Sequence, residues 1–181
     1  MDREKAIKAV KDLLEALGED TDREGLKDTP RRVADAFAEF VSGEGKSAKE
    51  HLIKTFSCDG SEMVVEKGIE FSSTCEHHLM PFFGEIAIAY IPDGRVVGLS
   101  KLARTVEVFS KRLQLQERLT AEIAEEIMKY LKPKGVMVVF EGVHTCMTCR
   151  GIKKAGSKTL SYSVKGEFPD ENKKEVLALI K

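Results

Sequence analysis

Two pairs of short apolar segments, on either side of one long helical pattern, limit the folds open to this chain of 181 residues. The first pair lies at 62–71 and 85–91, and the second at 136–140 and 159–168. Between them, apolar residues recur at helical spacing over 100–132. Paired strands beside an amphipathic helix are typical of a sheet covered by helices. The pattern therefore predicts an α+β fold, in which helices cover one face of an antiparallel sheet.

Further helical patterns precede and follow the sheet segments. They lie at 6–17 before Gly18, from Thr29-Pro30 to Gly43, at 47–53 and at 171–180, and the long pattern breaks near 111–116. We expect an N-terminal helical region over residues 1–58 and a sheet domain over 59–181. Four strands from one chain leave open sheet edges, which favours closure with other subunits.

Charge and composition exclude several classes of protein. The formal net charge is −1, so no basic field attracts nucleic acid or an anionic membrane surface. The charged start of the chain has no apolar signal segment, and no apolar run is long enough to span a bilayer. We therefore expect a cytoplasmic protein. Its four cysteines should be reduced there, which favours metal binding or catalysis over disulfides.

Two segments combine cysteine with histidine. Cys75 and His78 are three positions apart in the segment 73–78, a spacing that allows both side chains to reach one ion from a tight turn. Cys146 lies beyond the long helical pattern and offers a third ligand from a loop. Thiolate and imidazole ligands together suit zinc.

Two kinds of zinc site fit this spacing. With Cys149 as a fourth ligand, the group has the composition of a closed structural knuckle, which has no open position for catalysis. Against this, His77 lies beside His78, and His144 lies two residues before Cys146. A structural knuckle has no need of titratable groups beside both halves, whereas a hydrolytic site has.

At this point the chain resembles the GTP cyclohydrolase I family. Cys75-Glu76-His77-His78 is followed by segments similar to the family's GLSK-x-x-R, QERLT and H-x-C…RG motifs, at 98–104, 116–120 and 144–151. The segment 25–34 resembles the family's N-terminal helix signature. The matching blocks follow the family's order from residue 25 to 166. The resemblance implies a tunnelling fold (T-fold) with a catalytic sheet domain.

The resemblance also implies the roles of the cysteines and histidines. Cys75, His78 and Cys146 would be the ligands of one zinc ion per subunit, with the fourth position left for water. His77 and His144 would be catalytic: a protonated His144 near purine N7 would make C8 electrophilic, and His77 would transfer protons in later steps. The implied reaction opens the imidazole ring of GTP, releases formate and forms 7,8-dihydroneopterin triphosphate, the first step of pterin and folate-type biosynthesis.

The substrate residues follow from the same motifs. Gln116 and Glu117 would lie near the guanine base, where a carboxylate accepts hydrogen bonds from both the N1–H and N2–H donors. The residues implied around the triphosphate are Ser100, Lys101, Arg104, Arg150 and, from a neighbouring subunit, Arg32. The family also implies a homo-oligomer, a decamer whose active sites lie between subunits.

Two alternatives compete with this interpretation. A nitrile reductase on the same fold would use a cysteine nucleophile and NADPH without the zinc ligands, and the GLSK-x-x-R and QERLT segments argue against it. A non-catalytic protein with a structural zinc would use Cys149 as a ligand, a position where the family commonly has another residue. A turnover assay separates this second alternative from an enzyme.

Overall fold

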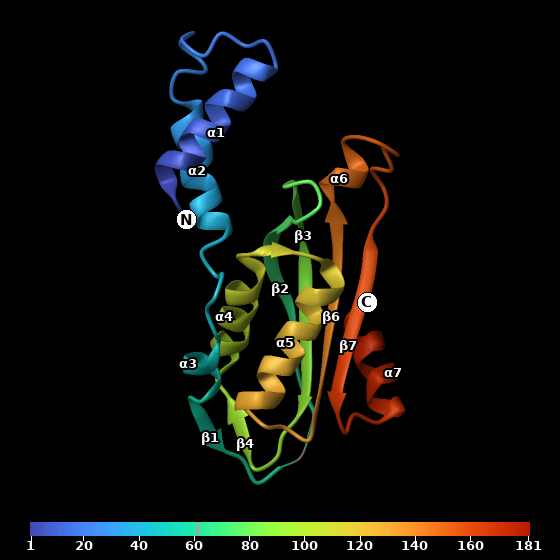
Figure 1. The fold of residues 1–181 in the computed structure, drawn as a ribbon. Coiled ribbons are helices and arrows are strands. Elements are labelled where there is room, and N and C mark those ends of the chain that lie inside the picture. The colour runs from blue at the N-terminus through green and yellow to red at the C-terminus, as the bar shows by residue number, and fades with distance from the viewer. Residues whose placement is uncertain (61) are drawn as a thin grey trace. The chain divides into compact units, whose positions relative to one another are not determined.

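A computed structural model describes residues 1–60 and 62–181 (Figure 1). The chain divides into two compact units, residues 1–42 and 43–181. None of the helices in the described residues is long and apolar enough to cross a membrane. The predicted division into residues 1–58 and 59–181 stays a prediction.

The first unit is a pair of helices. Helix α1 (Arg3–Ala16) begins after Asp2, whose side chain accepts a hydrogen bond from the Lys5 N–H, and Gly18 follows it at a φ of +83°, as expected of a helix stop. Helix α2 (Thr29–Phe40) begins with proline in its first turn, as predicted. An ion pair links the two helices, with 2.7 Å between Arg3 Nε and Asp35 Oδ1.

The second unit contains a five-stranded sheet in the order β5-β2-β3-β6-β7 and a separate pair, β1-β4. Its strands are β1 (Thr55–Ser57), β2 (Val64–Cys75), β3 (Pro81–Ile91), β4 (Arg95–Val97), β5 (Leu113–Gln114), β6 (Gly135–His144) and β7 (Thr159–Gly166). All neighbours in the large sheet are antiparallel except β5, which lies parallel to the end of β2. Its helices are α3 (Lys49–Leu52), α4 (Leu99–Ser110), α5 (Gln116–Tyr130), α6 (Thr145–Thr148) and α7 (Asp170–Leu179).

Helices cover both faces of the large sheet, which corrects the expectation of one covered face. On one face Ile86 and Ile88 of β3 pack with residues of α4 and α5. On the other, Ala87 and Ala89 pack with Val176 of α7. Consecutive residues of β3 are therefore buried, as in a strand with both faces covered. Alanine alternating with isoleucine leaves room for α7 on the small-residue side.

The α+β class and the antiparallel sheet packed by helices are confirmed. The break in the long helical pattern is also confirmed, and it contains β5, which no periodicity indicated. Strands β2 and β3 both extend further toward each other than predicted, to Cys75 and from Pro81. Only five residues therefore connect them (76–80). This tight turn directly follows Cys75 and contains both His77 and His78.

Candidate metal centre and active site

The turn from β2 to β3 holds Cys75 and His78 in a fixed relation. The Cys75 N–H donates to the Met80 carbonyl at 2.8 Å, and the Leu79 N–H donates back to the Cys75 carbonyl at 2.8 Å. Leu79 has a φ of +54°, a left-handed conformation that lets the chain reverse here. Cys75 Sγ lies 3.8 Å from His78 Nδ1 as a result.

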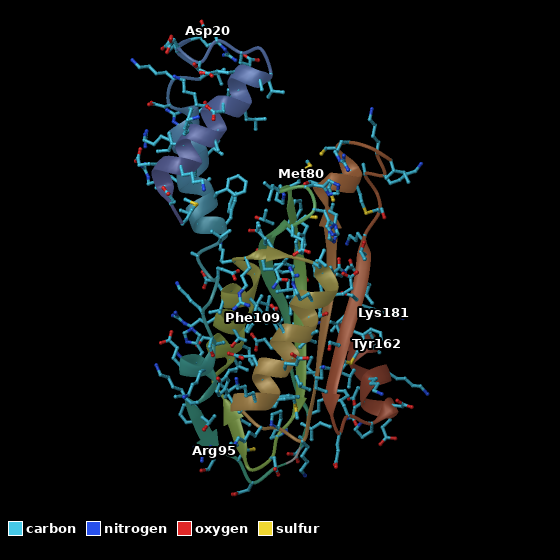
Figure 2. All side chains as sticks on the ribbon, in the orientation of Figure 1. Asp20, Met80, Arg95, Phe109, Tyr162 and Lys181 are labelled. Atoms are coloured by element: carbon cyan, nitrogen blue, oxygen red, sulfur yellow. The ribbon has the colours of Figure 1, made fainter. Side chains whose placement is uncertain are left out.

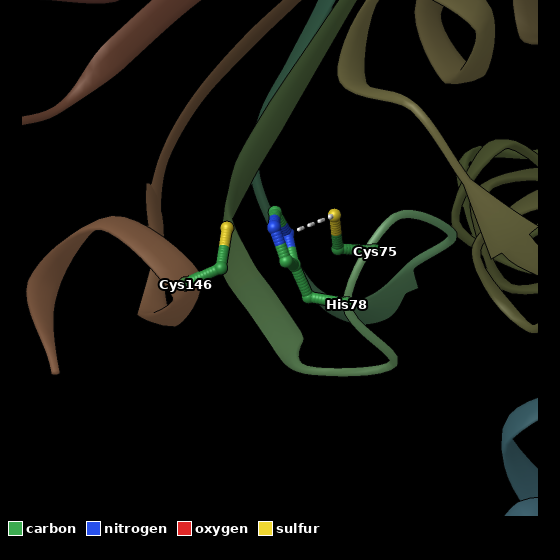
Figure 3. A group of neighbouring side chains, drawn as sticks. All are labelled: Cys75, His78 and Cys146. Carbon is green, nitrogen blue, oxygen red and sulfur yellow. Dashed lines mark hydrogen bonds between the residues drawn. The ribbon is translucent and has the colours of Figure 1, made fainter. Parts of the chain in front are cut away.

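Cys146 reaches the same point from the end of β6. The register pairs Phe82 of β3 with His144 of β6, so that α6 begins beside the turn. The Thr145 hydroxyl donates to the Pro81 carbonyl at 2.6 Å and fastens α6 there. Figure 3 shows the imidazole of His78 together with the sulfur atoms of Cys75 and Cys146.

The donor atoms of Cys75, His78 and Cys146 all lie within 4.8 Å of one another. Ligands of a tetrahedral zinc ion, about 2.0 to 2.3 Å from the metal, lie about 3.4 to 3.8 Å from each other. The Cys75–His78 spacing of 3.8 Å matches this range, and the 4.8 Å limit for the whole group exceeds it by only about 1 Å. Burial and the neighbouring Cys75 raise the pKa of the Cys146 thiol, while Arg150 lowers it. Two adjacent sulfur atoms therefore need a cation in order to be thiolates together, and the donor set fits zinc.

Cys149 is not part of this group of donor atoms in the described residues. Its side chain is exposed, and its thiol donates a hydrogen bond to the Thr145 carbonyl at 2.8 Å. The group of candidate ligands in the described residues therefore has three members, without the fourth thiol of a closed knuckle.

His144 is held by a stacked ring and by a buried amide. Its imidazole stacks on Phe82, with the ring centroids 4.8 Å apart and the planes within 4°. Its Nε2 lies 2.7 Å from Gln116 Oε1. The Gln116 amide nitrogen donates to the Thr159 carbonyl at 3.2 Å and to Ser161 Oγ at 3.0 Å. Because a carbonyl only accepts, this fixes the amide orientation, and His144 carries its proton on Nε2.

Two effects shift the pKa of the His144 imidazole in opposite directions. Burial lowers its pKa, because the protonated ring loses solvation, while the carboxylate of Glu117 raises the pKa. Glu117 is exposed in the first turn of α5, next to Gln116, which is only 2% exposed. His77 is exposed on the metal-binding turn, and its ring centroid lies 6.1 Å from that of His78.

Arg150 lies beside the metal ligands. Its Nη2 is 2.9 Å from His78 Nε2, and a guanidinium only donates, so this nitrogen accepts. A neutral imidazole that binds zinc through one nitrogen carries a proton on the other, which leaves neither nitrogen free to accept from Arg150. A metal ion held by His78 through Nδ1 would therefore free the Arg150 side chain from this contact.

The residues expected around the triphosphate are divided between distant parts of the chain. Ser100 and Lys101 follow Val97, whose N–H donates to the Tyr90 hydroxyl at 3.3 Å near the end of β3. The metal-binding turn lies at the other end, before Pro81. At about 3.3 Å per residue, these ends of β3 are roughly 30 Å apart. Figure 2 shows this separation with Met80 of the turn and Arg95 of β4 at opposite ends of the second unit.

The two remaining expected cations lie elsewhere. Arg104 is exposed one turn further along α4. Arg32 is exposed on α2 of the first unit, where its Nη2 lies 3.5 Å from Asp28 Oδ2. One chain therefore brings His144, Gln116 and Arg150 close to the three candidate metal ligands, whereas its Ser100 and Lys101 lie far from them.

A family model described as GTP cyclohydrolase I matches residues 6–181. The chain belongs to the GTP cyclohydrolase I family. Proteins named GTP cyclohydrolase 1 from Clostridium perfringens (strain 13 / Type A) and Clostridium kluyveri are 56% and 55% identical to it. These alignments cover 99% and 100% of this chain, and 98% and 99% of the relatives. A protein of the same name from Streptococcus pneumoniae is 55% identical over 93% of this chain and 91% of its own.

Among solved structures, the apo form of the archaeosine synthase QueF-Like has a TM-score of 0.49 and 20% identity, and the match covers 61% of this chain and 100% of that chain. The family model and the curated relatives confirm the resemblance to the GTP cyclohydrolase I family, while the roles of individual residues stay predictions. Phe82 and Ser161, which hold His144 and Gln116, were missed by the sequence analysis. No motif marks them, because their contacts depend on the pairing of β3, β6 and β7.

Proposed function

We propose that this chain catalyses the ring opening and rearrangement of GTP to 7,8-dihydroneopterin triphosphate and formate, as a GTP cyclohydrolase I. The observation that carries the proposal is the group of Cys75, His78 and Cys146 close to the half-buried His144, in a chain that belongs to this family. The product makes this the first step of pterin and folate-type biosynthesis.

The family is zinc-dependent, and Cys75, His78 and Cys146 would hold the ion. When bound, zinc supplies a Lewis acid that lowers the pKa of water to about 7 and so provides a nucleophile at neutral pH. Three protein ligands leave one position open for catalysis.

His144 is the proposed acid toward purine N7. Its Nε2–H is engaged by Gln116, so Nδ1 is the nitrogen at which a proton is gained or passed on. The carboxylate of Glu117 and the negative charge of GTP both favour the protonated ring against the effect of burial. The exposed His77, on the metal-binding turn, is the proposed proton carrier for the later ribose steps.

Glu117 is the proposed guanine receptor. It is exposed at the start of α5, one residue after the amide that holds His144. A carboxylate there accepts from the N1–H and N2–H donors of guanine and brings the purine to His144. Gln116 acts in this proposal both near the base and as the residue that fixes the His144 proton.

The triphosphate is bound between subunits in this proposal. Lys101 and Ser100 lie roughly 30 Å along β3 from the metal-binding turn of their own chain, which is longer than a GTP molecule allows. Arg150, released from His78 by metal binding, would meet the phosphates from the catalytic side. Arg104 and Arg32 complete the set of cations. We infer a cytoplasmic homo-oligomer, a decamer, in which a second chain supplies α4.

The test is incubation of the zinc-loaded protein with GTP, followed by oxidation and detection of fluorescent neopterin phosphate and of formate. We expect both products in equal amounts, a loss of turnover on chelation, and no reaction with ATP, which lacks the guanine donors. Zinc binding without formate release would favour the non-catalytic zinc protein. Equal use of ATP and GTP would contradict the role of Glu117.

A further inference from the structure

The metal-binding turn is tied to the start of α5 through Glu76, the residue between Cys75 and the two histidines. The Glu76 N–H donates to the Gln114 carbonyl at 3.1 Å. Its carboxylate accepts a hydrogen bond from Nη2 of Arg118. Arg118 directly follows Gln116 and Glu117 in the first turn of α5. One guanidinium therefore connects the turn that binds metal with the turn proposed to bind guanine.

Arg118 holds this position through further hydrogen bonds. Its Nε donates to Gln114 Oε1 at 2.9 Å, and its Nη2 also donates to the Leu113 carbonyl at 2.9 Å. These acceptors belong to β5, which lies parallel to the end of β2, where Cys75 pairs with Gln114. A planar guanidinium fixes the directions of all its N–H groups at once. Arg118 therefore holds the metal-binding turn and β5 in fixed positions relative to α5.

The network continues into the interior of the unit. Gln114 is 1% exposed, and its amide nitrogen donates to the Phe109 carbonyl at 3.1 Å and to Glu122 Oε2 at 2.8 Å. The Glu122 carboxylate also lies 3.4 Å from Arg112 Nη1. Arg118 is therefore held by the buried Gln114 as well as by Glu76, unlike an isolated surface ion pair, whose side chains are free to move.

We propose that Arg118 is a positioning residue, which acts through Glu76 to align the metal ligands with Glu117 and His144. This inference rests on the proposed function for its catalytic consequence, whereas its consequence for zinc binding does not depend on turnover. Groups that orient metal ligands without touching the metal typically change metal affinity or activity by about 10- to 100-fold when they are replaced.

The experiment compares Arg118→Lys, Glu76→Gln and the double variant with the parent. Lysine keeps the positive charge, but its single nitrogen lacks the planar fork that reaches all three acceptors at once, and glutamine keeps an acceptor without the charge. The matched control is Lys165→Gln. Lys165 of β7 forms an ion pair with Glu125 of α5, the helix that carries Arg118, with 2.8 Å between Nζ and Oε1. The side chains of Lys165 and Arg118 are both 39% exposed. Folding of every variant is checked by circular dichroism and thermal unfolding of the metal-free protein.

Zinc affinity is measured by competition with a chelator of known affinity, and GTP turnover is measured at saturating zinc. We expect each single variant to bind zinc about 10- to 100-fold more weakly. We expect kcat to stay about tenfold lower even when zinc saturates the site, because the turn and α5 are no longer aligned. The double variant should lose no more zinc affinity than the weaker-binding single variant, since both changes break one contact.

Several results would overturn the inference. Zinc affinity within twofold of the parent in Arg118→Lys would do so, and so would full recovery of kcat at saturating zinc. Multiplying losses in the double variant, or an equal loss in Lys165→Gln, would show a general effect on stability. If the parent binds zinc but releases no formate from GTP, the proposed function fails, and the zinc affinities alone then decide the role of Arg118.

Discussion

The two ends of β3 differ in how their functional side chains are held. At the start of the strand, Cys75, His78 and Cys146 converge, and His144 is fixed by a stacked ring and a buried amide. At the other end, Ser100 is exposed and Lys101 half-buried in the first turn of α4. The first set has hydrogen-bond partners that orient it before substrate arrives, whereas Ser100 lies open to solvent.

This difference has a physical basis. Chemistry on a purine ring needs groups placed to within a fraction of an ångström, which packing inside one chain provides. A triphosphate is bound through charge, and charge tolerates small displacements better than proton transfer does. A site that takes its catalytic half from one chain and its phosphate-binding half from another is consistent with both requirements. The following predictions test that division.

The largest effect is expected at the metal end. Cys146→Ser replaces a thiolate with a hydroxyl, a poor zinc ligand, so the variant should lose its zinc and its turnover should fall to background. Zinc content by elemental analysis and formate release from GTP measure the two losses. Full activity of this variant after chelation and dialysis would show that the ligand set is wrong.

A smaller loss is expected on the guanine side of the same end. Glu117→Ala leaves the N1–H and N2–H donors unpaired, and an unpaired buried donor costs about 1 to 3 kcal/mol, or roughly 5- to 150-fold in kcat/KM. Zinc content should not change. Glu117→Gln should fall in the same range, because an amide presents one acceptor only.

The control for Glu117 is Glu125→Gln, which alters an exposed glutamate on the same helix that pairs with Lys165. It should leave kcat/KM for GTP within twofold. A loss of zinc in the Glu117 variants, or an equal effect at Glu125, would contradict a direct contact with guanine.

The division between chains is tested by complementation. Lys101→Ala should raise KM for GTP about 10- to 150-fold, since a charge-assisted hydrogen bond contributes about 1.5 to 3 kcal/mol. His144→Ala should lower kcat about 10²- to 10⁴-fold. When the two chains assemble together at random, about one quarter of the interfaces combine an intact α4 with an intact metal end. The mixture should therefore recover up to about a quarter of the parent's activity.

A second mixture, Arg32→Ala with His144→Ala, should behave in the same way if Arg32 also comes from a neighbour. Assembly is followed by light scattering at the concentration of the assay. A fully active monomer, or mixtures no more active than the sum of their components, would mean that each chain builds its own site.

The smallest effect is expected at Cys149, close to the metal end but outside the ligand group. Cys149→Ala should keep its zinc and should remain within about twofold of the parent's turnover in reducing buffer, because surface substitutions away from special features have small effects. It should also resist mild peroxide better, since an oxidised Cys149 can form a disulfide with Cys146. Coupled loss of zinc and turnover would instead indicate a closed four-ligand site.

The longer helices, the four long strands and the group of candidate zinc ligands could all be predicted from the sequence. These predictions rest on local features, such as the helix stop at Gly18, the alternation of strand residues and the Cys75–His78 spacing. Local features can be recognised in the sequence before the fold is known. The short strand β5 and the second covered face of the sheet could not be predicted from the sequence. A two-residue strand has no periodicity, and the alternation of alanine with isoleucine in β3 hides that both faces are apolar.

How the parts of the site meet could be seen only in the folded chain. Gln116 and His144 are 28 residues apart, and Glu76 and Arg118 are 42 apart, yet both pairs are in hydrogen-bond contact. The separation of Lys101 from the metal-binding turn is equally invisible in the motifs, which follow one another along the chain. Such relations depend on strand register and on the direction in which α4 and α5 cross the sheet. Both are set by the packing of the whole core, which no single segment of sequence encodes.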